Sequence, residues 1–228
     1  MFRRLLLMGA AMALTLGTGT LVVVSSTPAS ASVPVITANG IATCSTLAGA
    51  IHFNPPLFNT GTSNTETSTI KVKLNKLTAG CSTTATNLPA GGILYGKATS
   101  TITTTTADNS ANACGGLATS RSTTQTVTWH YKNSAGVTLA KLTPTTVTFS
   151  GFDVLFNGIG EPGFDLPQDT AGTATATGSF AGSSSTANVF ATKTTSFITT
   201  KCGKSTGLTT LPLGGPGTVA DPSQSVTG

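Results

Sequence analysis

The sharpest alternation of apolar and polar residues lies at Thr123–Tyr131, which also holds the only tryptophan of the chain. Val127, Trp129 and Tyr131 share one parity, whereas His130 and the intervening threonines share the other. Because successive side chains of a strand point to opposite sides, this period of two predicts a strand with one buried face. We expect it at the centre of the core, with Trp129 as its largest buried side chain.

Similar runs recur along the chain and are separated by turn residues. The clearest is Thr67–Leu77, where apolar and polar positions alternate as in an antiparallel sheet with one solvated face. Further strands are expected in Val33–Cys44, Leu47–Phe53, Ile93–Thr106, Val137–Leu142, Thr145–Phe156, Thr170–Phe180 and Thr186–Cys202. About nine short strands with turns between them predict an all-β fold, an antiparallel β-sandwich, with a β-barrel as the alternative. The architecture is immunoglobulin-like, but the spacing of Cys114, Trp129 and Cys202 does not match a true immunoglobulin domain.

Glycine and proline give the finer expectations. Asn54-Pro55-Pro56 is expected to end a strand, since proline cannot donate to a ladder. Gly96 and the change of parity at Ser150-Gly151 indicate bulges or a corner. Asn157–Asp169 is rich in glycine and proline and is expected to form a loop.

The N-terminus has the pattern of a secretory signal peptide. A basic Met1-Phe2-Arg3-Arg4 precedes an apolar run, and Ala29-Ser30-Ala31 provides a small-x-small cleavage site. We expect a signal peptide at 1–31, a single β-sandwich domain at 32–206 and a flexible tail of Gly, Pro, Ser and Thr at 207–228. The alternative is an uncleaved anchor, since the apolar run could span a bilayer. The cleavage site favours a secreted product with no membrane attachment once the signal is removed.

Four cysteines follow the expected signal peptide. An even number in an exported chain predicts two disulfides, and three pairings are open. We favour Cys44 with Cys81 and Cys114 with Cys202. A zinc site is excluded, because there is no CxxC motif and the two histidines, His52 and His130, are far apart in the sequence.

The chain is poor in charge and rich in threonine. Only 8% of residues are charged, the formal net charge is +5, and about a fifth of the residues are threonine. The lysines are scattered without the dense basic stripe that nucleic-acid binding requires, so nucleic acid is excluded as a partner. The exposed surface is expected to be neutral and hydrogen-bonding.

Four segments carry a resemblance: Ala42-Thr43-Cys44, Ile51–Leu57, Leu77–Cys81 and Val127-Thr128-Trp129. In these the chain resembles a loose group of secreted, disulfide-bonded, mostly uncharacterised proteins of actinobacterial type. The resemblance implies export and disulfides, and it carries over no catalytic residue.

Two sets of residues are candidates for a site. Oxygen ligands for calcium could come from Asp153, Asn157, Glu161, Asp165 and Asp169, although no EF-hand pattern is present. The same acids could serve a small extracellular hydrolase as an acid–base pair. Exposed aromatic rings could instead bind carbohydrate, and the candidates are Trp129, Tyr131 and Tyr95.

The sequence contains no catalytic constellation, since it has no G-x-S-x-G elbow and His130 is expected on an outward face. We therefore expect no enzyme and no cofactor apart from calcium. The preferred interpretation is a secreted structural or interaction protein at or outside the cell envelope. Its partner would be a cell-wall polysaccharide or an envelope protein. The alternatives are a carbohydrate- or cell-wall-binding module and the small hydrolase.

Overall fold

A computed structural model describes residues 32–105, 111–118, 121–157, 161–166, 175–181, 184–214 and 224–227. The chain divides into two compact units, Met1–Ser32 and Val33–Gly228, and the fold given below is that of the second unit. The expected signal peptide at 1–31 lies outside the described residues, so it stays a prediction.

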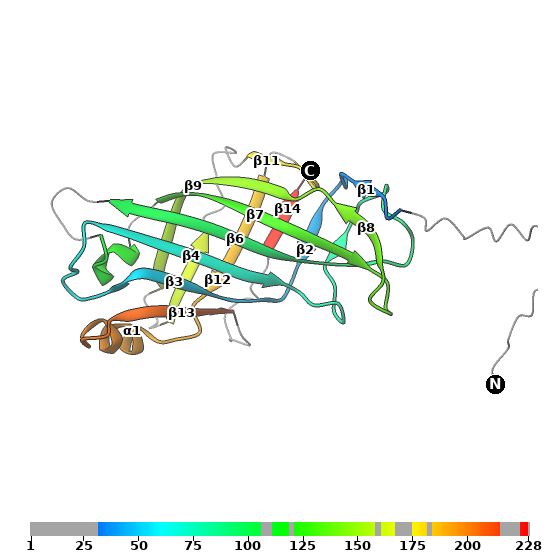
Figure 1. The fold of residues 1–228 in the computed structure, drawn as a ribbon. Helices are drawn as coiled ribbons and strands as arrows, with labels where there is room; N and C mark the ends of the chain where they lie inside the picture. Colours follow the sequence, from blue (N-terminus) through cyan, green and yellow to red (C-terminus); the bar gives the residue numbers. More distant parts are fainter. Residues whose placement is uncertain are drawn as a thin grey trace, which may run out of the picture. The chain divides into compact units, whose positions relative to one another are not determined.

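The regular structure in the described part of Val33–Gly228 is mostly strand, which confirms the all-β class (Figure 1). The strands are β1 (Val35–Ile36), β2 (Ala42–Cys44), β3 (Leu47–Leu57), β4 (Thr65–Leu74), β5 (Ser82–Thr83), β6 (Ile93–Thr105), β7 (Arg121–Lys132), β8 (Thr138–Leu142), β9 (Thr145–Asn157), β10 (Glu161–Leu166), β11 (Thr175–Thr177), β12 (Ser184–Phe190), β13 (Leu208–Gly214) and β14 (Gln224–Thr227). Two short helices accompany them, the 3-10 helix η1 (Cys114–Ala118) and the α-helix α1 (Thr195–Cys202).

The strands pair in the order β13-β3-β4-β6-β7-β9-β10-β12-β14-β2-β5, with β1, β8 and β11 off this path. We call the run from β13 to β9 the main sheet. Its pairs are antiparallel, as the alternation in Thr67–Leu77 predicts. Among the named strands, β1 and β8 form a parallel pair.

Strand β9 connects the main sheet to the strands that follow it in the pairing order, beginning with β10. Its first half pairs with β7 and its second half with β10. Arg121 and Thr123 of β7 face Phe152 and Phe149 of β9, so β9 carries one extra residue between them. The extra residue falls at Ser150-Gly151, the position where the change of parity predicts a bulge or corner.

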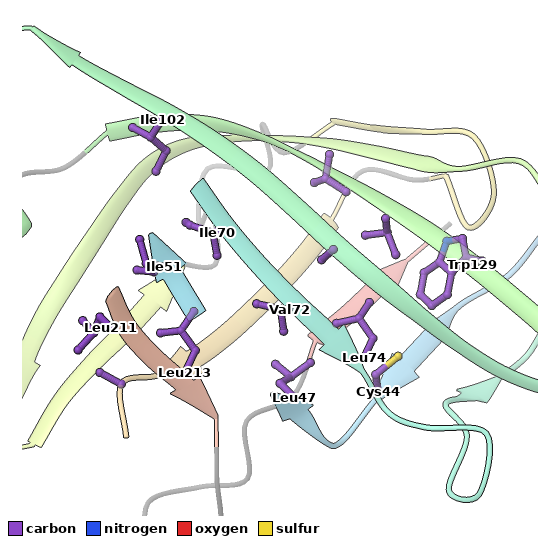
Figure 2. Close-up of a cluster of buried hydrophobic side chains, with 14 of the residues drawn as sticks. Cys44, Leu47, Ile51, Ile70, Val72, Leu74, Ile102, Trp129, Leu211 and Leu213 are labelled. Carbon is purple, nitrogen blue, oxygen red and sulfur yellow. The ribbon is translucent and has the colours of Figure 1, made fainter. Parts of the chain in front are cut away.

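The core lies on the inner face of the main sheet. Leu47, Leu74, Val127 and Trp129 of this sheet form one buried cluster with Cys44 of β2. Figure 2 shows these side chains, apart from Val127, among the labelled residues, and Figure 1 shows β2, β12 and β14 crossing behind β3, β4 and β6. Two layers of strands with a shared apolar interior make the fold sandwich-like.

Two disulfides link separate segments of the chain beside this core. Cys44 of β2 is bonded to Cys81, and Cys114 of η1 is bonded to Cys202 of α1, which is the pairing favoured from the sequence. Disulfides form and persist in oxidising compartments, so the protein is suited to the outside of the cell.

The prolines in the segment Asn54-Pro55-Pro56 do not end a strand. β3 continues through them to Leu57. The register of β13 against β3 shifts between Leu208 and Thr210, so the prolines lie at an irregularity of the ladder where their missing N–H groups are tolerated.

Gly96 is not a bulge. It pairs in regular register with Leu74 and Trp129, and a Cβ at this position would lie 3.1 Å from Trp129 Cε3. Glycine leaves room here for the indole ring of Trp129, which a Cβ would contact closely.

Three C-terminal expectations were wrong. The loop expected at Asn157–Asp169 contains strand β10, which pairs with β9. The final strand expected at Thr186–Cys202 ends at Phe190 and is followed by helix α1, because Thr194 caps the helix with a 3.3 Å bond from Phe197 N to its Oγ1.

The flexible tail expected at 207–228 begins instead with β13. Its leucines, Leu208, Leu211 and Leu213, are buried in the core, and the strand pairs with β3 at the edge of the main sheet. β14 pairs with β12 and β2. The segment contains few apolar residues and therefore has the composition of a flexible tail, although each of these leucines packs in the core.

Candidate functional site

Trp129 is a core residue and offers no exposed ring to a ligand. It is 4% exposed, and its Nε1 donates to Thr145 Oγ1 over 2.7 Å. Its ring meets Phe180 edge to face, with 5.1 Å between ring centroids. The sequence correctly predicts its burial, and this burial removes it from the set of carbohydrate-binding candidates.

Tyr131 is buried in the same way, with 5% of its surface exposed. Its hydroxyl donates to Pro89 O over 2.6 Å, and Gly92 lies against its ring so closely that a Cβ would overlap it. Tyr95 is the candidate that keeps an accessible part. It lies on the outer face of the main sheet, and its ring stacks on His130 with centroids 5.0 Å apart.

The five candidates for a calcium or hydrolase site lie on or beyond the β9–β10 hairpin. Asp153 and Asp165 are directly opposed in register, and so are Asn157 and Glu161. The structure describes the backbone of these four, whereas Asp169 lies outside the described residues. Elsewhere in the described ranges, no three His, Cys, Asp or Glu side chains come close enough to hold a metal ion.

The outer face of the main sheet carries a regular array of threonines, which we call the threonine face. Its members with described side chains are Thr65, Thr67 and Thr69 of β4, Thr99, Thr101 and Thr103 of β6, Thr124, Thr126 and Thr128 of β7, and Thr146 and Thr148 of β9. Each is partly or fully exposed, and the residues between them point into the interior or toward it.

The threonines are also aligned across the strands. Thr67 is opposite Thr103, and Thr126 is opposite both Thr99 and Thr146. The Oγ1 atoms of the next opposed pair, Thr124 and Thr148, lie 3.5 Å apart. Neighbouring strands are about 4.8 Å apart and alternate residues along a strand about 6.7 Å apart, so hydroxyl and methyl groups repeat in two directions.

Lysines border one end of this array. We define the lysine cluster as Lys71 and Lys73 of β4, Lys97 of β6 and Lys132 of β7. Lys73 is directly opposite Lys97, and Lys132 follows the Tyr95–His130 stack by two residues on β7. Burial first, and then the charges of Lys97 and Lys132, lower the pKa of His130 below its ordinary value of 6.5.

The opposite face of the same strands contains a buried polar group that sequence reasoning missed. Glu66 is 1% exposed, and Ser68 Oγ donates to its two carboxylate oxygens over 2.9 and 3.0 Å. Ser100 of β6 and Gln125 of β7, which are directly opposed to each other, are also buried on this face, and Ser100 lies opposite Ile70 of β4. The sequence does indicate that Glu66 is buried, because Glu66 has the same parity in the strand as the inward residues Ile70 and Leu74.

No protein-family model, curated protein or solved structure matches this chain. Within the described ranges, neither helix is long and apolar enough to cross a membrane. The outer face of the main sheet is therefore the candidate site, on the basis of its geometry.

Proposed function

We propose that this protein is an exported, non-catalytic binding protein that holds a polysaccharide of the cell exterior against its threonine face. The observation that carries the proposal is the alignment of exposed threonines across β4, β6, β7 and β9. Export is supported by the two disulfides and by the signal-peptide pattern at 1–31.

A threonine array suits a polysaccharide for two physical reasons. Each hydroxyl can both donate and accept, so it can match the hydroxyls of a sugar in either direction. The β-branched side chain has few rotamers, so the hydroxyls lose little entropy when a ligand binds. Many weak contacts along an extended polymer then add up to useful avidity.

The proposal replaces the aromatic site that the sequence suggests. With Trp129 and Tyr131 buried, Tyr95 is the remaining one of the three aromatic candidates, and it lies at the lysine end. Binding would therefore depend on the hydroxyls of the threonine face more than on stacking.

The test is co-sedimentation of the protein, with disulfides intact, with isolated cell walls and insoluble neutral polysaccharides. T101V/T126V removes two central hydroxyls and keeps the β-branched shape. If each hydroxyl contributes a net hydrogen bond of about 0.5–1.5 kcal/mol, the dissociation constant rises by about 5- to 150-fold.

The matched control is T200V/T206V, which makes the same change at two exposed positions in and after α1. It should bind as the wild type does. Equal binding by T101V/T126V and the wild type would contradict the proposal, and so would failure of the wild type to sediment with any polysaccharide.

A second candidate, binding to ice, is favoured by the repetition of methyl and hydroxyl groups in two directions on the same face. Such an array can hold water in a repeating pattern, which an ice surface continues. Growth of ice crystals in the presence of the wild type, of T101V/T126V and of the control distinguishes this candidate. Inhibition that is lost in T101V/T126V would support ice, and no inhibition by the wild type would exclude it.

A further inference from the structure

We propose that the polymer is anionic and that the lysine cluster, with Tyr95 and His130, holds its phosphate or carboxylate groups. The inference rests on the proposed function, because it assigns the charged end of the same outer face. It identifies the partner by charge complementarity, which the threonine face alone does not do.

The first observation is a like-charge pair. Lys73 and Lys97 are directly opposite on the adjacent strands β4 and β6, and Lys71 lies two residues from Lys73 on the same side. Like charges in directly opposed positions of a sheet repel each other and destabilise it. An anion between the two ammonium groups would turn this repulsion into attraction.

The second observation is that neighbouring strands place no acid beside the cluster. The residues opposite its members are neutral or are themselves lysines: Ala50 and Thr99 for Lys71, Ala48 and Lys97 for Lys73, Thr128 for Lys97, and Ile93 and Thr138 for Lys132. Glu66, the acid whose side chain is described, is buried on the inner face. The cluster is thus not neutralised by the strands that surround it.

The third observation is that two lysines of the cluster direct their positive charge toward the same place, the ring of His130. The charges of Lys97 and Lys132 both act on the His130 ring, which lies between them in register on the outer face. Tyr95 stacks on that ring and adds a phenol to the same outer face. Ammonium groups and a phenol together are suitable donors for phosphate or carboxylate oxygens.

The cluster is continuous with the threonine face along the strands. Lys97 and Thr99 are successive outward residues of β6, and Thr128 and His130 are successive outward residues of β7. One polymer chain could therefore place hydroxyls on the threonines and an acidic group on the lysines.

The experiment measures binding of the full chain to three soluble polymers: poly(glycerol phosphate), polygalacturonate and neutral dextran. Titrations are made at several salt concentrations. The wild type should bind at least one anionic polymer more tightly than dextran, with an affinity that falls as salt rises. The two anionic arms distinguish a phosphate ligand from a carboxylate ligand.

K73Q/K97Q neutralises the opposed pair and keeps most of each side-chain stem. We expect its affinity for the preferred anionic polymer to fall about tenfold, with a weaker dependence on salt. The matched control, K193Q/K204Q, removes two exposed lysines near α1 and should leave both quantities unchanged. Circular dichroism and thermal unfolding confirm that each variant is folded.

The outcomes separate the two proposals. If T101V/T126V weakens binding to polysaccharide and K73Q/K97Q does not, the proposed function holds and the anionic inference is wrong. If only K73Q/K97Q weakens binding, the inference holds and the threonine face is not the site. Equal binding of dextran and both anionic polymers by the wild type, at every salt concentration, would also overturn the inference.

Discussion

Trp129, Thr145 and Ser179 form a buried chain of hydrogen bonds that joins β7, β9 and the segment after β11. Trp129 Nε1 donates to Thr145 Oγ1 over 2.7 Å, and the same hydroxyl donates to the carbonyl oxygen of Ser179. Thr145 and Ser179 are fully buried, and Ser179 Oγ in turn accepts from Ala38 N over 3.0 Å. Replacing Thr145 by valine keeps the shape of the side chain and removes the hydroxyl that holds this chain together.

The expected cost follows from the two bonds. Leaving a buried polar group without its partner costs about 1–3 kcal/mol, and T145V affects both the indole N–H and the Ser179 carbonyl. The added methyl group returns about 0.8 kcal/mol. We expect a net loss of about 3 kcal/mol in the free energy of unfolding and a fall of about 6–12 °C in Tm for a unit of this size.

T145S is the control because it keeps the hydroxyl and loses a methyl group, at a cost of about 1 kcal/mol. Urea unfolding with disulfides intact, followed by circular dichroism and by the fluorescence of the single tryptophan, measures all three proteins. The expected order of stability is wild type, T145S, T145V. If T145V equals or exceeds T145S, apolar packing decides the stability of this site and the hydrogen-bond argument is refuted.

Two further predictions concern the disulfides and His130. The chain-entropy model gives a stabilisation of about 4.6 kcal/mol for Cys114–Cys202, which closes a loop of 88 residues, and about 3.8 kcal/mol for Cys44–Cys81, which closes a loop of 37. C114S/C202S should therefore unfold at a lower urea concentration than C44S/C81S. The reverse order would contradict the chain-entropy model. Because the pKa of His130 is lowered in the fold, the unfolded chain binds this proton more readily, so stability should fall as the pH drops below about 6.5. NMR titration should place the pKa of His130 below 6.5 in the wild type and higher in K132Q, and equal values would show that Lys132 does not act on the ring.

Parity along single strands was the most informative feature of the sequence. In Thr123–Tyr131 it correctly placed Trp129 and Tyr131 inside and His130 on the outer side. The parity of Thr67–Leu77 holds for β4 as well, and it would have placed Glu66 inside had the strand been extended by one residue. A period of two is reliable here because each strand of the main sheet has one buried and one solvated face.

Helix α1 could not be recognised from local preference. Its threonines, Phe197 and Ile198 all favour strands, so the segment has the composition of a strand. Ile198 and Cys202 are buried four residues apart, and the disulfide to Cys114 fixes this turn of helix against the core. Long-range contacts overrode the local preference, and the pairing partner of a cysteine cannot be inferred from its neighbours in sequence.

The threonine face depends on information that the sequence contains only in part. The outward parity of the threonines in each strand can be seen in the sequence, but the order and register of the strands cannot. Thr126 meets Thr146 because β7 pairs with β9, although β8 lies between them in the chain. Two of the aromatic candidates, Trp129 and Tyr131, failed because they lie on the inward parity of Thr123–Tyr131, which the sequence already shows.

The amount of threonine does not by itself require a function. A wide outward sheet face with few charges needs residues that are polar and that also favour strands, and threonine meets both needs. Valine favours strands as well as threonine does but has no hydroxyl, so T101V/T126V separates the contribution of the side chain to the fold from the contribution of its hydroxyl to ligand binding. The lysine cluster has no such structural explanation, because Lys73 opposite Lys97 weakens the sheet that carries it. If K73Q/K97Q is more stable than the wild type and binds the anionic polymer more weakly, the lysine pair contributes to anion binding at a cost in stability.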